Sequence, residues 1–270
     1  MRSDVGDAHM GHERLGLLPR TRKWRQIVEG VSGWSSTEEA PSAIAADTLR
    51  HVRSRFQRLG TDAGANAAFG FLVSLAGACR VRNPLEQLRK LGIRLPNQLT
   101  ALSLAGELRR CVEAEDGEPE YAAIAQGAAV DAITQWYACR SDDQRVLFDS
   151  HEDPFNVWRS AGTGAGFCEL ARHFFAGLTT RYLCYFLDRE ASACLADVEE
   201  RERFQAALRE HVEDVSKHAF ETARITQSFA AGWFNKHIVA GPPEEETVRR
   251  FLSFALTKMR EELAREGASG

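Results

Sequence analysis

Large apolar side chains recur every three or four residues along the segment 167–186. At about 100° per residue they fall within roughly a third of a helix circumference, so the spacing predicts a long helix with one apolar face. Burying one aromatic side chain contributes roughly 1.5–3 kcal/mol, so the stripe must be covered. We expect it to form the main core, although its tyrosines would also suit an interface. The stripe consists of Phe167, Leu170, Ala171, Phe174, Leu178, Tyr182 and Tyr185, widened by Phe175 and Phe186.

Helical spacing continues through the other segments of the chain. Residues 195–234 carry a second apolar seam, from Phe204 to Trp233, opposite an acidic face, and this seam predicts a second long amphipathic helix. Residues 67–79 are apolar on nearly all sides, which is typical of a central buried helix. The segment most similar to a strand, 237–239, is too short to require a sheet. The sequence therefore predicts an all-α fold, either a multi-helix bundle or an irregular helical array, without significant sheet.

Turn and capping residues divide these helices. The segment Gly60 to Gly64 is expected to end one helix, and Asn83-Pro84 to begin another, because an N-cap followed by proline starts a helix. Pro96-Asn97 is expected to begin a third helix. The three glutamates from Glu244 to Glu246 are expected to open the last helix, where the helix dipole favours anions.

A chain of 270 residues can bury a sizeable core. We divide it into a basic N-terminal segment with a short helix (1–36), a helical N-terminal half (37–150) and a helical C-terminal half (151–270), which a single domain could unite. The hydrophobic fraction of 44% and the charged fraction of 27% are those of an ordinary globular protein. The net charge of −4 disfavours a dedicated nucleic-acid coat but permits a local basic patch.

Cysteine usage and the first residues indicate the compartment. The six cysteines occur singly, without a C-x-x-C pair or the spacing of a zinc site. Cysteine thus behaves as a small apolar core residue, which is typical of a reducing compartment. The first ten residues lack the apolar core of a signal peptide, and the longest apolar stretch is about half of the span that a bilayer needs. We expect a cytoplasmic bacterial protein without membrane association.

A glycine-rich turn, Gly162 to Gly166, precedes the aromatic stripe. Exposed amides at a helix start attract anions, so the backbone of Gly164 and Gly166 could hold a phosphate or another ligand. A dinucleotide site needs a preceding strand, and a P-loop needs a Lys-Ser/Thr pair, whereas Phe167 and Cys168 follow this turn. The pattern favours a turn that lets two helices approach closely.

Two histidines, His211 and His218, lie seven residues apart in the second apolar region, beside acidic residues. They could contribute to a metal site or an acid–base site. Two helical turns separate them by roughly 10 Å, so they could not share one ion without bending of the helix. No Glu-x-x-His motif of di-iron carboxylate bundles occurs in the chain. Ion-paired histidines at the boundary of the core are the favoured interpretation, here and for Glu169 with His173.

No motif of a nucleophilic or nucleotide-dependent enzyme is present. The chain has no G-x-S-x-G elbow, no H-E-x-x-H motif and no kinase or NTPase signature. Catalytic residues can come from distant positions, so these absences do not exclude an enzyme. The sequence assigns no catalytic residue, no cofactor and no metal ligand, and it favours a non-catalytic role.

Basic residues gather in the N-terminal part of the chain. Between residues 12 and 58 there are nine basic residues and five acidic ones, and arginine predominates over lysine, which suits recognition of phosphate or carboxylate. Such a surface could contact nucleic acid, dock an acidic partner or this protein's own acidic helix, or simply stay solvated. The candidate contact residues are Arg20, Arg22, Lys23, Trp24, Arg25, Arg50 and Arg53.

The segment His12 to Thr21, with the sequence HERLGLLPRT, resembles part of accessory proteins from bacterial multigene operons, including phage-defence operons. The resemblance is confined to this segment and assigns no role to any residue, and no family is recognised for the whole chain. It implies an accessory subunit of such an operon.

We therefore hypothesise a non-catalytic interaction or scaffold subunit of a cytosolic bacterial complex, which associates with itself or with a partner protein. One alternative is a nucleic-acid-binding module that uses the arginine-rich N-terminal surface, with binding that weakens steeply with salt. Another is a ligand- or metal-dependent enzyme centred on the turn Gly162 to Gly166 and on His211 and His218.

Overall fold

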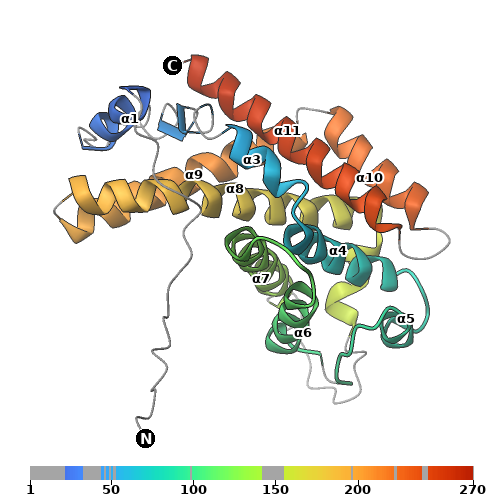
Figure 1. Ribbon diagram of the computed structural model, residues 1–270. Helices are drawn as coiled ribbons and strands as arrows, with labels where there is room; N and C mark the ends of the chain where they lie inside the picture. The colour runs from blue at the N-terminus through green and yellow to red at the C-terminus, as the bar shows by residue number, and fades with distance from the viewer. Residues whose placement is uncertain are drawn as a thin grey trace, which may run out of the picture.

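A computed structural model shows an array of α-helices with one short 3₁₀ helix (Figure 1). It describes residues 22–32, 44–45, 47–48, 50, 53–97, 99–141, 155–195, 197–221, 224–238 and 243–269. Every regular element in these ranges is helical, which confirms the predicted all-α fold. None of the helices within the same ranges is both long and apolar enough to cross a membrane.

Helix α4 (Ala63–Ala78) is a central buried helix, as its sequence predicts (Figure 1). It packs against α5 (Pro84–Lys90), α6 (Ala101–Glu113), α7 (Pro119–Ser141) and α11 (Glu245–Ser269). Small residues bring these helices close together. A Cβ atom on Gly64 would lie only 2.6 Å from the Cβ of Ala122 on α7, so glycine at this position permits the short distance between α4 and α7.

Helix α8 (Gly164–Cys194) is the longest helix that the structure describes. Among the elements that pack against it are α1 (Arg22–Ser32), α7, α9 (Val198–Glu221) and α10 (Arg224–His237). The 3₁₀ helix η1 (Asn156–Gly162) leads into α8 and also contacts α4. Helix α11 lies across α9 and α4 and contacts α3 (Arg53–Leu59) (Figure 1). The last helix therefore packs against two of the first helices, α3 and α4.

The aromatic stripe on α8 forms the main core, as predicted. Phe174, Phe175 and Tyr182 are fully buried. Phe69 on α4 has its ring centroid 5.1 Å from that of Phe174 and 5.2 Å from that of Phe175. Phe251 on α11 stacks against Phe69, with the centroids 5.6 Å apart. Rings from three helices therefore meet around Phe69.

Capping side chains decide where the helices begin. Helix α5 begins at the predicted position, and Asn83 Oδ1 accepts the amide of Glu86. Helix α6 begins at Ala101, after the predicted start at Pro96-Asn97. The reason is a capping box, in which Thr100 and Ser103 each accept the other's backbone amide through the side-chain hydroxyl.

The region 195–234 forms two helices, α9 and α10, instead of the single long helix that its seam predicts. Leu208 and Val212 of the seam are buried on α9, but Phe229 on α10 is 38% exposed. Trp233 of the seam is buried on α10, and both Trp233 and its neighbour Phe234 stack on Phe167 of α8, with centroids 5.9 and 4.3 Å apart. The buried face of α10 therefore includes only part of the predicted seam.

Candidate functional site

Helices α7 and α9 both pack along α8 and leave a groove between them. The groove has a volume of about 660 Å³, and its lining residues in the described part of the chain belong to these three helices. This volume lies within the usual range for binding sites. The floor on α8 includes the small residues Ala176, Gly177 and Thr180.

Among the polar residues that α8 contributes are His173, Arg181 and Cys184. Their spacing of eight and three residues places them on one side of the helix. Most of the aromatic stripe lies on the neighbouring side and is buried in the core, whereas its member Tyr185 is half-buried and lines the groove. The same amphipathic helix thus supplies both the core and the groove.

Charged residues lie on both walls of the groove. Arg181 makes a bidentate ion pair with Asp131 of α7, at 2.8 and 3.0 Å. On the α9 wall, Arg209 and Glu213 are both exposed and line the groove. Within the described part of the chain neither of them has an ion-pair partner. On the α7 wall, the charge of Asp131 is therefore neutralised by Arg181 of α8. On the α9 wall, the charges of Arg209 and Glu213 are not neutralised by an ion pair with a described residue.

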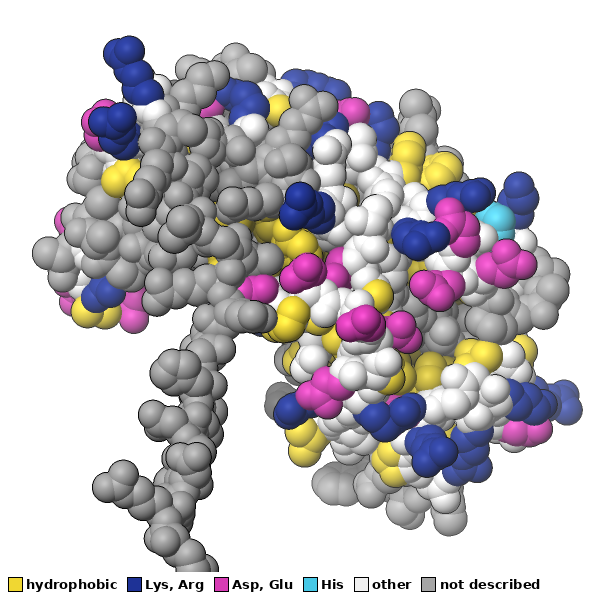
Figure 2. Space-filling model, viewed as in Figure 1, with side chains coloured by type: hydrophobic (Ala, Val, Ile, Leu, Met, Phe, Trp, Pro, Cys, Tyr) yellow, Lys and Arg dark blue, Asp and Glu magenta, His cyan; other side chains and the backbone are white. Residues whose placement is uncertain are grey.

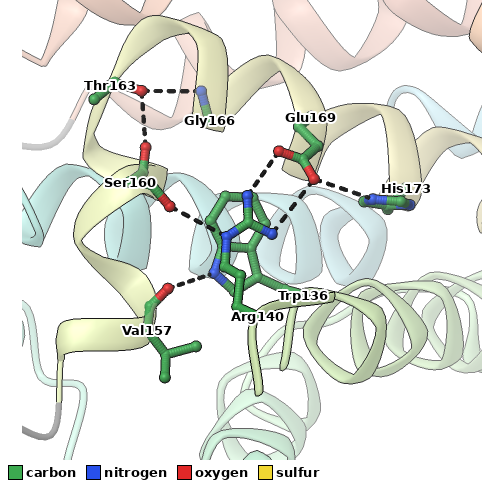
Figure 3. Close-up of polar contacts among 8 residues, drawn as sticks. All are labelled: Trp136, Arg140, Val157, Ser160, Thr163, Gly166, Glu169 and His173. Atoms are coloured by element: carbon green, nitrogen blue, oxygen red, sulfur yellow. Dashed lines mark hydrogen bonds and ion pairs between the residues drawn. The ribbon is translucent and has the colours of Figure 1, made fainter. Parts of the chain in front are cut away.

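Near one end of the groove a polar network joins α7, η1 and α8 (Figure 3). The Arg140 guanidinium donates to Glu169 Oε2 at 2.7 Å, to Glu169 Oε1 at 3.4 Å and to Ser160 Oγ at 3.2 Å. Its Cζ lies 3.4 Å from the centroid of the Trp136 ring, and Trp136 Nε1 donates to the carbonyl of Val157. A planar guanidinium suits such stacked and forked contacts, so Arg140 holds Glu169 in position.

His173 lies where this network reaches the groove (Figure 3). Its Nε2 is 3.9 Å from Glu169 Oε1, so the two predicted partners lie close together, but this separation is too long for a hydrogen bond. Burial lowers the pKa of His173, and Arg172 and Arg140 lower it further, against the opposing effect of Glu169 and Glu213. The imidazole is therefore mainly neutral near pH 7 and can donate one hydrogen bond and accept another.

We expect the wild-type protein to lose stability more steeply than a His173→Gln variant as the pH falls from about 7.5 to about 5.5. The pKa of His173 is lowered in the folded state, so the unfolded state binds more protons between the folded and unfolded pKa values. The stabilisation is complete above the unfolded pKa of about 6.5 and is lost as the pH falls through the folded one. Thermal unfolding midpoints measure this difference, and an equal pH dependence in both proteins would contradict it.

The glycine-rich turn is closed by packing. The amide of Gly166 donates to Thr163 Oγ1 at 3.0 Å, and a Cβ atom on Gly166 would lie 1.9 Å from the carbonyl oxygen of Ser160. A Cβ atom on Gly164 would lie 3.0 Å from the Cβ of Ala231 on α10. These contacts agree with a turn that brings two helices together, and they occupy one of the two amides considered for an anion.

The candidate basic surface is partly described. Arg22 and Arg25 are exposed on α1, and Arg50 is exposed and pairs with Asp47 at 2.5 Å. On the side of the molecule in Figure 2, basic and acidic side chains are interspersed. The contact of this surface with nucleic acid or protein stays a prediction. Outside the described residues lie Arg20 and the side chains of Lys23, Trp24 and Arg53.

His211 and His218 both belong to α9, but the groove residues of this helix are others, namely Gln205, Arg209 and Glu213. His211 is half-buried, and the side chain of His218 lies outside the described ones. Among the described residues, no three His, Cys, Asp or Glu side chains are grouped as a metal ion would need. The structure therefore does not bring His211 into the groove that holds His173.

Sequence patterns do not identify this groove. Asp131 and Arg181 are 50 residues apart, and Arg140 and Glu169 are 29 apart, so only the packing of the helices shows that they meet. The one local signal is a pair of polar residues four positions apart beside an apolar stripe, as in Glu169 with His173.

Comparisons with known proteins leave the groove to be interpreted from its own geometry. No protein-family model, curated protein or solved structure matches the chain.

Proposed function

We propose that the protein is a non-catalytic interaction subunit that holds a charged helix of a partner protein in the groove between α7, α8 and α9. The observation that carries this proposal is that Arg209 and Glu213 line the groove without an ion-pair partner among the described residues. On α6, Arg109 and Glu113 have the same order and spacing, and they close into an ion pair at 2.7 Å. Arg209 and Glu213 make no such pair, so both charges are available to a partner.

The floor of the groove suits a helix. Packed helices have axes about 8–10 Å apart, and small side chains at the contact permit the shorter distances. Ala176, Gly177 and Thr180 supply such a floor on α8. A partner helix lying there with an acidic and a basic residue about one turn apart would pair with Arg209 and Glu213.

The network around His173 favours binding over proton transfer. A hydrogen bond of about 2.6–3.2 Å is typical between a general base and the group that orients it, whereas His173 Nε2 is 3.9 Å from Glu169. Both oxygens of Glu169 accept from Arg140 instead. This carboxylate therefore holds α7 against α8, which keeps the groove in shape.

Photo-crosslinking in the native host tests the proposal. A photoreactive residue in place of Gln135, which is exposed on the groove wall, should capture the partner chain. The same residue in place of Leu102, which is 83% exposed on α6 and outside the groove, should not capture it.

The captured chain is then purified and titrated against variants of α9. We expect Arg209→Glu to weaken its binding at least about tenfold, which corresponds to about 1.4 kcal/mol. Arg203→Glu is the matched control, because Arg203 is exposed on the same helix and does not line the groove. Circular dichroism and thermal unfolding should be alike for the two variants.

Four outcomes would redirect or contradict this proposal. A captured chain that binds Arg209→Glu as tightly as wild type contradicts it, as does a strict monomer that captures nothing. Self-association that light scattering detects and Arg209→Glu abolishes makes the partner a second copy of the chain. Salt-sensitive binding to duplex DNA that is lost when Arg22 and Arg25 become glutamate favours the nucleic-acid module instead.

A further inference from the structure

A second groove lies beside α4, between the α5–α6 connection and the start of α11. Its volume is about 370 Å³, near the lower end of the range for small-molecule sites. Apolar side chains from each of these elements line it, among them Phe71, Leu91, Ile93 and Val248. It shares no residue with the groove between α7, α8 and α9, so a ligand could bind here whether or not a partner helix occupies that other groove.

Gly70 on α4 opens onto this groove. Glycine inside a helix destabilises it by roughly 0.5–1 kcal/mol relative to alanine, so it needs a reason. The other two glycines of α4 have one: a Cβ atom would lie 2.6 Å from Ala122 at Gly64, and 3.0 Å from Ile238 at Gly77. Among the described residues, no atom would lie within 4 Å of a Cβ atom on Gly70. No contact within this part of the chain therefore requires glycine at position 70, and its effect is to leave the groove open.

One turn before Gly70, Asn66 lines the same groove. Only 4% of this residue is exposed. Its Nδ2 donates to the carbonyl of Asp62 at 2.7 Å, which settles the orientation of the amide. Its Oδ1 is buried and has no hydrogen-bond donor among the described residues. A buried acceptor without a donor is unfavourable, so a ligand that supplies an N–H or O–H group would be stabilised here.

The charges at the groove select among such ligands. Glu115 and Glu245 are the charged residues among the described ones that line it, and both are exposed. Burial raises the pKa of the Cys111 thiol, so this lining residue is neutral. Arg110 lies beside Cys111, with its Nη2 3.9 Å from the Cys111 Sγ, but its guanidinium is paired with Glu107. The two lining carboxylates therefore favour a positively charged ligand and disfavour an acid.

We propose that this groove binds a small apolar amine, whose hydrocarbon body fills the space beside Gly70 and whose N–H group donates to Asn66 Oδ1. The apolar walls provide the affinity, Asn66 orients the ligand, and the two carboxylates set the preference for positive charge.

Three probes of similar size test this proposal on the uniformly ¹⁵N-labelled full chain. Benzylamine has the apolar body, the charge and the donor, and we expect it to shift amide signals of α4 with a Kd on the order of 1 mM. Benzyltrimethylammonium keeps the positive charge without an N–H donor, and benzoate reverses the charge. Each of these two should bind at least about tenfold more weakly than benzylamine.

A groove-filling variant gives the second readout. Gly70→Leu should weaken benzylamine binding at least about tenfold without lowering the thermal unfolding midpoint, because its Cβ meets no other atom. Gly106→Leu is the matched control, since Gly106 is an exposed glycine inside α6 whose Cβ would also have no atom within 4 Å. This control should bind benzylamine like the wild type.

The proposal is overturned if benzylamine causes no shifts at about ten times the expected Kd. Benzylamine binding that Gly70→Leu leaves unchanged would place the ligand elsewhere on the protein. Equal binding of benzylamine and benzyltrimethylammonium would remove the role of Asn66, and equal binding of benzoate would remove the role of the carboxylates.

Discussion

Replacing Phe69 with alanine should lower the free energy of unfolding by about 3–5 kcal/mol, the usual cost of removing a fully buried aromatic side chain. Phe69 has no exposed surface. Its ring contacts Phe174 and Phe175 of α8 and stacks on Phe251 of α11. These helices cannot move independently to fill the space, because each is also packed against other helices. The cavity should therefore persist, and urea unfolding followed by circular dichroism measures the loss.

Phe229→Ala is the matched control for this prediction. Phe229 also stacks on Phe251, at 5.7 Å, and contacts Phe254 at 4.4 Å, but it is 38% exposed. Because folding buries less apolar surface at Phe229 than at Phe69, we expect Phe229→Ala to lower the free energy of unfolding by less than about 2 kcal/mol. Equal losses in the two variants would mean that Phe69 is not the centre of the aromatic core.

Periodicity predicts the core helices because burial and helical spacing coincide in them. The stripe from Phe167 to Phe186 is buried as its spacing implies, and so is the apolar helix α4. The seam between Phe204 and Trp233 fails as one element, because a hydrophobic pattern records which side chains are buried and does not record where the chain changes direction. Two helices with separate neighbours produce nearly the same pattern as one long helix.

Helix starts are predictable only where the capping signal is local and familiar. Asn83 before proline is such a signal, and α5 begins there. The capping box of α6 uses Ser103 in place of the usual glutamate or glutamine, and the earlier Pro96 is the stronger sequence signal. The start of α6 is therefore set by two hydroxyl groups that a sequence pattern underweights.

The groove is less predictable than the fold because its residues come from three helices. The charge of Arg181 is plain in the sequence, but its neutralisation by Asp131 depends on how α7 crosses α8. In the same way, Arg209 and Glu213 resemble any ion pair on a helix surface, and only their side-chain positions show that they do not pair. Sequence patterns identify charged residues, and packing decides which charges remain open.

Replacing Asp62 with alanine should lower the free energy of unfolding by about 2–4 kcal/mol, since the change removes an N-cap and a second charge-assisted hydrogen bond. Asp62 Oδ1 accepts the amide of Ala65 at 2.8 Å and caps α4. Its Oδ2 accepts the amide of Glu118 at 2.8 Å, 56 residues away. One buried carboxylate thus joins the starts of α4 and α7, where a Cβ atom on Gly117 would lie 2.6 Å from the amide nitrogen of Gly64.

Asp62→Ser separates the two contributions. A serine hydroxyl can still cap α4, but it is too short to accept the amide of Glu118 as well. Asp62→Ser should therefore be about 1 kcal/mol more stable than Asp62→Ala. The remaining difference in the free energy of unfolding between Asp62→Ser and the wild type measures the contribution of the contact between the two helix starts. Hydrogen exchange at the Glu118 amide should quicken in both variants, because both lose its acceptor. Wild-type stability in Asp62→Ser, together with unchanged exchange at Glu118, would show that the cap is the whole role of this carboxylate.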